Sequence, residues 1–366
     1  YPSHIYNEML ADTDASRKLR NRNRPRLRVV ASHGRLPRDT FNGGAGDTPY
    51  NCTLTEGRYR VRGGAARASG LRMLLPGFYV QGGGNGEADA PYPGIFRGAI
   101  EQATPSNGQI AKRVNVSGSR SITVPVGGYL ITAPVGLKLE AYGDIIVHSS
   151  LQVNSGETML RTPTPNVSGN GDVSYKSTLT DSSSQVGTTS TWVTTSRTAN
   201  QSVYCPAAIL GVVETESPSI LFVCDSIGYG FGSGDNGDSA GNYGYMQRAA
   251  WNGGSPVPSL IIGQSGDACY RYGAYYDGTL RFPLAEYTTH GFVNLGVNDL
   301  TSTFTVTQIQ GWLKYIWRQL KMQGLHVTQA LITPKTSSSD SWATEANQTH
   351  STYFDPGNRR DQLNAW

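Results

Sequence analysis

The twelve residues from Ser219 to Gly230, SILFVCDSIGYG, constrain the fold more strongly than any other stretch of this chain. Ile220–Val223 is a short, continuous apolar run, which is typical of a buried strand in a parallel sheet. The run leads into Asp225-Ser226 and then into closely spaced glycines. A serine at the end of such a strand can be held rigidly at the carboxyl edge of the sheet, where reactive groups gather in open α/β folds. An ordinary strand end with a capping serine accounts for the same residues, so this stretch alone leaves both interpretations open.

Further apolar runs follow the first one, at intervals that leave room for helices. They are Leu260–Ile262, Phe292–Leu295 and Val327–Ile332. From Val306 to Gln323 the apolar residues recur at helical spacing, and Thr305 with Gln308 predicts a capping box at the start of this helix. Gly324 fits its C-terminal stop. This alternation predicts a parallel sheet covered on both faces, so we expect residues 206–366 to form a three-layer α/β domain.

The first half of the chain has a different pattern. Between residues 31 and 153, short segments of period-two alternation, such as Gly128-Tyr-Leu-Ile-Thr and Asp144-Ile-Ile-Val-His, are separated by Gly, Pro and Asn. They predict an antiparallel β-sandwich without a catalytic cluster, and Gly82-Gly-Gly-Asn-Gly predicts a flexible loop. Residues 154–205, rich in Ser, Thr and Asn, are expected to be a connection or a few edge strands. The fold class is therefore a two-domain α+β chain, with the sandwich first and the parallel-sheet domain second.

Residues 1–30 are expected to be an extended basic arm. Between Arg17 and Arg38 the chain has nine basic residues and no acidic one, although the net charge of the whole chain is only +4. No aromatic residue is interleaved with these cations, so stacking on single-stranded nucleic acid is not predicted. We expect the arm to dock inside an assembly rather than to bind nucleic acid.

Several classes of protein are excluded by simple counts. The four cysteines include no C-x-x-C pair, so neither a zinc site nor a redox dithiol is predicted, and Cys224 is expected to be a buried thiol. No apolar run is long enough to span a membrane. Because the chain starts at Tyr1 and shows no secretory signal, we expect the sequence to be a processed or trimmed product.

Three polar clusters follow successive predicted strands of the second half. They are Asp225-Ser226, Gly263-Gln-Ser-Gly266 and Gly296-Val-Asn298-Asp299. Because the carboxyl ends of parallel strands meet at one edge of a sheet, these clusters predict a site there. Acyl transfer needs a nucleophile and donors for the developing oxyanion, which the Ser226 hydroxyl, the Gly266 N–H and the Asn298 amide would supply. A turn glycine at Gly266 and an Asx turn at Asn298 are the simpler alternatives.

In this order, D-S-x-x-x-G from Asp225, then Gly266, then G-x-N-D from Gly296 resemble the SGNH, or GDSL-type, hydrolase family over about residues 206–366. The resemblance implies a flavodoxin-like α/β fold with Ser226 as the nucleophile. It also implies that the Ser226 N–H, Gly266 and Asn298 form the oxyanion hole, and that Asp299 braces the loop carrying Asn298.

A second, looser resemblance concerns the first half. Arg97-Gly-Ala-Ile-Glu101 and Ala133-Pro-Val-Gly-Leu137 are similar to an accessory β-domain that precedes such hydrolases in some phage and bacterial proteins.

The sequence departs from the family at two places. Cys224 stands where the family has Gly, and no D-x-x-H motif, which carries the family's general base, ends the sequence. Asn347-Gln-Thr-His350 has the spacing but Asn in place of Asp. Pro356–Trp366 predicts the start of a helix after which the family places its final strand and D-x-x-H loop. The base is therefore expected beyond Trp366, with His350 and a degenerate site as the alternatives, and residues 206–366 are expected to be incomplete at their C-terminus.

Two functions are compatible with these features. The first is a serine esterase or deacetylase, extracellular or carried on a phage particle, which acts on O-acyl groups of a glycan or on another acyl ester and needs no metal or organic cofactor. The second is a non-catalytic structural or receptor-binding virion component with a hydrolase-like fold. For either function we expect an oligomer, with the arm at residues 1–30 contacting other virion proteins.

Overall fold

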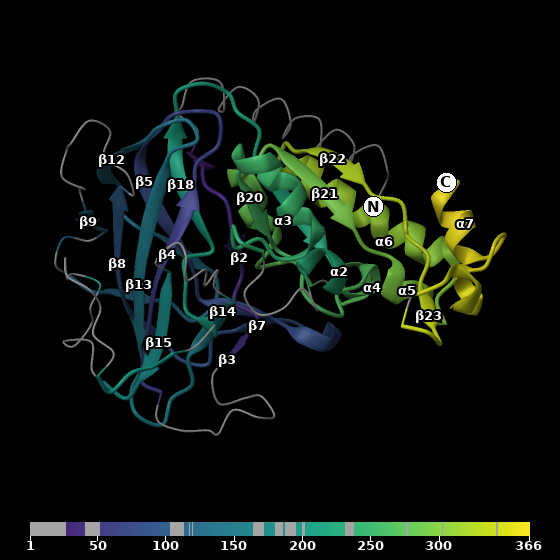
Figure 1. Ribbon diagram of the computed structural model, residues 1–366, viewed down its shortest axis with the longest axis horizontal. Helices are drawn as coiled ribbons and strands as arrows, with labels where there is room; N and C mark the ends of the chain where they lie inside the picture. The colour runs from purple at the N-terminus through teal and green to yellow at the C-terminus, as the bar shows by residue number, and fades with distance from the viewer. Residues whose placement is uncertain are drawn as a thin grey trace, which may run out of the picture.

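The computed structural model describes residues 27–40, 52–102, 113–116, 118, 120–163, 172–179, 186, 195–199, 202–230, 238–275, 277–301, 303–341 and 343–366. Antiparallel sheets form one half of the molecule, and a parallel sheet with helices forms the other half (Figure 1). Most of the predicted arm lies outside the described residues. No helix of the described part is long and apolar enough to cross a membrane.

Two antiparallel sheets make up most of the first half. The first sheet has the order β1-β18-β5-β11, and β12 also pairs with β5. Its strands are β1 (Leu27–Val29), β18 (Ala208–Val213), β5 (Ala68–Pro76), β11 (Tyr129–Ile131) and β12 (Val135–Leu139). The second sheet has the order β10-β8-β13-β4-β15-β16, with β9 beside β8. Its strands are β4 (Leu54–Arg62), β8 (Gly94–Gln102), β9 (Arg113–Asn115), β10 (Ile122–Val124), β13 (Asp144–Gln152), β15 (Val173–Ser177) and β16 (Thr198–Ala199).

Smaller sheets of two or three strands lie in both halves. They are the sheet of β17 (Ser202–Val203), β14 (Leu160–Pro163) and β3 (Asp39–Thr40), the hairpin of β6 (Phe78–Gln81) and β7 (Gly86–Asp89), and the hairpin of β23 (Thr336–Ser338) and β24 (Gln348–His350).

The first antiparallel sheet is buried on both faces. Leu71, Met73 and Leu75 of β5 belong to the core shared with the second sheet. Leu74 between them belongs to a different core, which also contains Leu210 of β18 and the helices. Successive side chains of a strand point to opposite faces. This sheet therefore separates two apolar cores and contributes side chains to both.

The parallel sheet has the order β2-β20-β19-β21-β22. Its strands are β2 (Gly34–Arg35), β20 (Ser259–Ile261), β19 (Ile220–Cys224), β21 (His290–Asn294) and β22 (His326–Gln329). Every neighbouring pair is parallel, with Phe222 opposite Ile261 on one side and Phe292 on the other. The apolar runs expected to be strands thus pair with one another, although the last strand ends at Gln329 rather than at Ile332.

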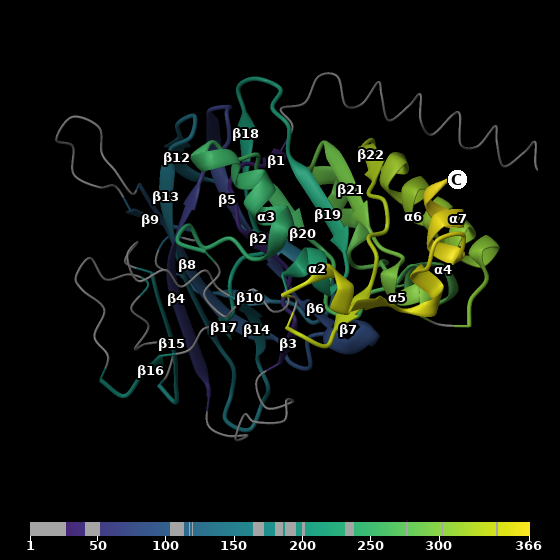
Figure 2. The ribbon, with the colours of Figure 1, turned by 45° about the vertical axis from the view of Figure 1, so that its right-hand side comes forward.

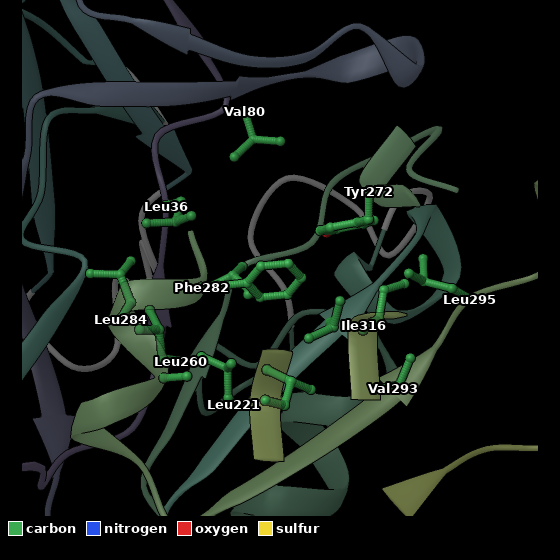
Figure 3. Close-up of a cluster of buried hydrophobic side chains, with 14 of the residues drawn as sticks. Leu36, Val80, Leu221, Leu260, Tyr272, Phe282, Leu284, Val293, Leu295 and Ile316 are labelled. Carbon is green, nitrogen blue, oxygen red and sulfur yellow. The ribbon is translucent and has the colours of Figure 1, made fainter. Parts of the chain in front are cut away.

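Helices cover both faces of the parallel sheet (Figure 2). The described α-helices are α2 (Ser226–Tyr229), α3 (Gly244–Trp251), α4 (Cys269–Ala274), α5 (Val297–Leu300), α6 (Val306–Met322) and α7 (Arg359–Asn364). The described 3-10 turns are η1 (Gly82–Gly84), η5 (Asn252–Gly254), η6 (Phe282–Tyr287), η7 (Glu345–Asn347) and η8 (Thr352–Phe354). On one face Met246 of α3 packs with Phe222 and Ile261. On the other face Ile316 of α6 lies in one apolar cluster with Leu221, Leu260 and Val293 (Figure 3).

Strand pairing crosses the boundaries expected from the sequence. β1 lies within residues 1–30 and β18 within residues 206–366, yet they pair with each other in the first sheet. β2 lies within residues 31–153, yet it is an edge strand of the parallel sheet. Residues from both halves share one apolar core, so the sandwich and the helical layer are in direct contact. Their status as independent domains stays a prediction.

Candidate active site

Ser226 begins α2 directly after β19, at the carboxyl edge of the parallel sheet. Asp225 is the N-cap, and its Oδ1 accepts a hydrogen bond of 2.9 Å from the Ile227 N–H. Gly230 ends the helix with φ +93° and donates its N–H to the Ser226 carbonyl at 3.0 Å. A Cβ at Gly230 would lie 2.5 Å from the Gly244 nitrogen, so the stop has room only for glycine. The predicted strand, serine and glycine therefore fold as a strand, a cap and one turn of helix.

The second cluster lies against the end of the first. Gly263 follows β20, and a Cβ on it would lie 1.9 Å from the Cys224 carbonyl oxygen, so the two strand ends touch through their backbones. Gly266, three residues on, has φ +81°, a conformation that favours glycine. The loop that carries Gly266 is therefore adjacent to the residue that precedes Asp225-Ser226.

The third cluster is tied to the second by side-chain hydrogen bonds. The Asn298 amide on α5 donates to the Asp267 carbonyl at 2.8 Å. Asp299 accepts hydrogen bonds from the N–H groups of Cys269 at 2.8 Å and Tyr270 at 2.9 Å. Asp299 directly follows Asn298 on α5, so these bonds tie the turn that carries Asn298 to the first turn of α4, which follows the Gly266 loop. The role of Asp299 in bracing this turn stays a prediction.

Ser226, Gly266 and Asn298 thus follow β19, β20 and β21, three neighbouring strands of one parallel sheet. The Gly263 contact joins the first cluster to the second, and the Asn298 bond joins the second to the third. An amide nitrogen carries two hydrogens, and the bond to Asp267 fixes the orientation of both. The catalytic roles of the three residues stay a prediction.

Three buried carboxyl groups surround this edge of the sheet. Asp225, Asp267 and Asp299 are 1%, 3% and 0% exposed. Burial raises the pKa of Asp225 to about 6; the bond from Ile227 acts against this, and the charges of Asp267 and Asp299 reinforce it. Burial also raises the pKa of the Cys224 thiol well above its usual range, so Cys224 is the inert buried thiol expected from the sequence.

His350, which the sequence offered as an alternative base, does not pair with Asn347. It ends β24, while the Asn347 amide donates to Asp340 at 3.1 Å. The His350 Nδ1 instead lies 3.9 Å from Oδ1 of Asp355, and both side chains are about 40% exposed, at 43% and 45%. Asp355 was missed by the sequence analysis because it follows the histidine, whereas the family motif places the acid before it.

The other described histidines lie elsewhere, and His33, just before β2, stacks on the Trp251 ring at 5.7 Å. His290 and His326 begin β21 and β22, at the amino edge of the sheet and so opposite Ser226, as expected from their positions. His148 pairs with Glu101 at 2.9 Å in the second antiparallel sheet. Within the described residues, no group of three or more His, Cys, Asp or Glu is arranged to hold a metal ion.

The glycine-rich segment after Gln81 also contacts the candidate site. It was expected to be a flexible loop, and it forms η1 at the tip of the β6–β7 hairpin. The Gly83 N–H donates to the Ser265 carbonyl at 2.8 Å, next to Gly266. The sequence carried no signal for this contact, because the two segments are far apart in the chain.

The chain matches no protein-family model and no curated protein. Among the solved structures that resemble it is a GDSL-like lipase from Bacteroides thetaiotaomicron, 15% identical, with a TM-score of 0.27. That match covers 40% of this chain and 60% of the lipase. A putative acylhydrolase from Bacteroides fragilis is 14% identical over 42% of this chain and 64% of its own length, with a TM-score of 0.27. The chain therefore spans less than two thirds of the length of these two proteins.

A family two carbohydrate esterase from Clostridium thermocellum, solved in complex with cellohexaose, is 13% identical. Its match covers 79% of this chain and 74% of that protein, with a TM-score of 0.28. The first match carries the name of the GDSL-type family that residues 206–366 resemble in sequence. All three TM-scores are low.

Proposed function

We propose that this protein is a serine ester hydrolase in which Ser226 is the nucleophile. One observation carries the proposal: Ser226, the Gly266 loop and Asn298 follow three neighbouring parallel strands and are held together by backbone packing and a side-chain hydrogen bond. A nucleophile at the start of a helical turn, next to loop N–H groups and an amide, is the arrangement that acyl transfer needs.

In this mechanism the Ser226 hydroxyl oxygen attacks the ester carbonyl carbon while a general base takes the hydroxyl proton. The carbonyl oxygen becomes an oxyanion, which the N–H groups of Ser226 and Gly266 and the Asn298 amide stabilise. The bond to the alcohol then breaks, and the base returns the proton to the leaving oxygen. Water attacks the acyl-serine by the same route and releases the acid. The base in this proposal is a histidine, and among the described residues the candidate is His350, which faces Asp355.

We further propose O-acyl groups of a glycan as the substrate, and an extracellular or virion-associated location. The contact between the β6–β7 hairpin and the Gly266 loop supports a role for the β-rich half in presenting a large substrate to Ser226. An oligomer and a contact of the arm with other virion proteins remain parts of this proposal.

The test is hydrolysis of p-nitrophenyl acetate, and of an acetylated glycan, by the intact protein. Ser226→Ala should lower turnover by roughly 10³-fold or more, because the nucleophile is lost. Ser219→Ala is the matched control, since Ser219 is buried just before the same strand, at its amino end, and should leave turnover unchanged. Full activity in Ser226→Ala would rule out the mechanism, and no activity in any intact preparation would favour the non-catalytic virion role.

Two further variants separate the donors from the base. Asn298→Ala should lower turnover by roughly 10²–10³, because one oxyanion donor is lost while the nucleophile remains. His350→Ala should be nearly as damaging as Ser226→Ala if His350 is the base. If another group is the base, His350→Ala should barely change turnover.

A further inference from the structure

The β6–β7 hairpin belongs to the β-rich half of the chain, yet it packs on the loop that carries Gly266. Gly83 donates its N–H to the Ser265 carbonyl at 2.8 Å, and the Gln264 side chain donates to the Val80 carbonyl at 3.3 Å. Val80 lies in the same apolar cluster as Tyr272 and Phe282 of the helical layer (Figure 3). Hydrogen bonds therefore hold the hairpin to this loop, and apolar packing holds it to the helical layer beside the loop.

At the hairpin tip, two glycines meet backbone to backbone. A Cβ on Gly266 would lie 2.5 Å from the Gly84 nitrogen, and a Cβ on Gly84 would lie 2.8 Å from the Gly266 carbonyl oxygen. Both residues have positive φ, +81° and +78°. A side chain at either position would displace the loop, so the tip sets where the Gly266 backbone lies.

Below the tip, a buried arginine joins the hairpin to the same loop. The Arg281 side chain is 0% exposed, and its Nε lies 2.8 Å from Oε1 of Glu87 on β7. Its Nη1 lies 2.6 Å from Oδ2 of Asp267 and donates to the Ile262 carbonyl at 3.1 Å. The Tyr272 hydroxyl donates to the same Asp267 oxygen at 2.8 Å.

Asp267 links Arg281 to the proposed oxyanion donors. It directly follows Gly266, and its carbonyl accepts the Asn298 amide at 2.8 Å. Glu87, Arg281, Asp267 and Asn298 therefore form one continuous chain of hydrogen bonds from the β-rich half to the site. Oxyanion stabilisation depends on donors that are fixed before the reaction, and small displacements of such groups cost large factors in rate.

We propose that Glu87 and Arg281 are positioning residues, which hold Asp267 so that the Gly266 N–H and the Asn298 amide face the developing oxyanion. The β-rich half is then part of the catalytic machinery rather than only a carrier. The catalytic consequence rests on the proposed ester hydrolysis, whereas the positioning itself does not.

The decisive variant is Glu87→Gln, which keeps the shape of the side chain and removes its charge. Its matched control is Glu56→Gln, because Glu56 also forms a buried pair, with Arg197 at 2.6 Å, in the second antiparallel sheet. Both variants should lower the melting temperature. Only Glu87→Gln should lower kcat on p-nitrophenyl acetate, by roughly 10–100-fold with little change in KM, because the donors act in the transition state. An equal fall in kcat in the two variants, or none in Glu87→Gln, would overturn the proposal.

A second pair of variants applies even if Glu87→Gln does not fold. Gly84→Ala adds a methyl group that presses on the Gly266 carbonyl and changes no charge. Gly156→Ala is the matched control, because Gly156 also has a positive φ, +87°, and its added methyl group meets nothing within 4 Å. Gly84→Ala should lower kcat and Gly156→Ala should not. Equal kcat values for these two variants would contradict a role for the hairpin tip.

Hydrogen exchange distinguishes failure of this proposal from failure of the proposed function. The backbone amides from residue 265 to residue 269 should exchange faster in Glu87→Gln and Gly84→Ala than in their controls, whether or not the protein hydrolyses esters. Unchanged exchange there would overturn the positioning role. If exchange is faster in Glu87→Gln and Gly84→Ala but Ser226→Ala keeps its activity, the positioning role stands and the proposed esterase mechanism is wrong.

Discussion

Two effects act in opposite directions on the ionisation of the Asp225 side chain. Its carboxylate caps α2 by accepting the Ile227 N–H, which orients the turn that begins with Ser226. Burial at the same time disfavours the charged form and raises the pKa of Asp225 to about 6, where an exposed aspartate has 3.8. The folded protein therefore binds a proton at this residue between about pH 4 and pH 6, where the unfolded chain has already released it.

This difference predicts the sign of a pH effect on stability. Ionisation of Asp225 costs nothing below about pH 4, and the cost develops as the pH rises through 4 to 6, reaching about 3 kcal/mol for a shift of about two units. Asp225→Asn retains a capping oxygen and removes the ionisation. The test measures the free energy of unfolding of both proteins by urea titration at pH 4 and pH 8. The difference, Asp225→Asn minus wild type, should be larger at pH 8 than at pH 4 by about 3 kcal/mol. Parallel pH profiles for the two proteins would refute the assignment.

At the scale of elements, α6 depends on its first turn. The Gln308 N–H donates to the Thr305 hydroxyl at 3.3 Å, and the Gln308 side chain accepts the Thr305 N–H at 2.8 Å. This is the capping box predicted from the sequence, and it starts the helix whose buried stripe covers one face of the parallel sheet.

Loss of this cap should have a measurable cost. Thr305→Ala leaves the Gln308 N–H without its acceptor and should lower the free energy of unfolding by about 1 kcal/mol. Thr307→Ala is the control, because Thr307 is also exposed in the same turn and alanine has the higher helix propensity, so this change should be neutral or slightly stabilising. Equal losses in denaturant titrations of the two variants would show that the cap does not stabilise α6.

Local signals account for what the sequence predicted and what it missed. Strands β19, β20 and β21, the capping box of α6 and its glycine stop at Gly324 depend on neighbouring residues, so their pattern is readable without the fold. β2 is two residues long and β18 is an apolar strand like its neighbours, so nothing local assigns either to its sheet. The links from Glu87 to Arg281 and from Asn298 to Asp267 join distant segments, which only the folded backbone brings together.

At the scale of the whole molecule, the first antiparallel sheet joins the two halves. Leu210 of β18 is fully buried and faces the core that includes α6, while its neighbour Ile209 faces the second sheet. Separation of the halves would expose this apolar face to water. The halves should therefore unfold together in one cooperative transition.

Leu210→Ala tests this coupling. It should lower the free energy of unfolding by about 2–5 kcal/mol, and the transition should remain single. Tryptophan fluorescence, to which Trp312 and Trp317 on α6 contribute, and circular dichroism of the whole chain should give the same midpoint. Leu331→Ala, at a leucine that is 68% exposed, should change little. Two separate midpoints in the wild-type protein would show that the halves unfold independently.

The segment from Leu27 to Thr40 has a consequence for the time course of folding. Within fourteen residues it contributes β1 to one antiparallel sheet, β2 to the parallel sheet and β3 to a third sheet. Its partners are synthesised late, because Leu27 pairs with Val212 and Gly34 with Leu260. At about 5–20 residues per second, a ribosome takes roughly 10–45 s to make the chain between such partners. This segment thus leaves the ribosome well before its partners do, and the three sheets can be joined only after Leu260 has been made.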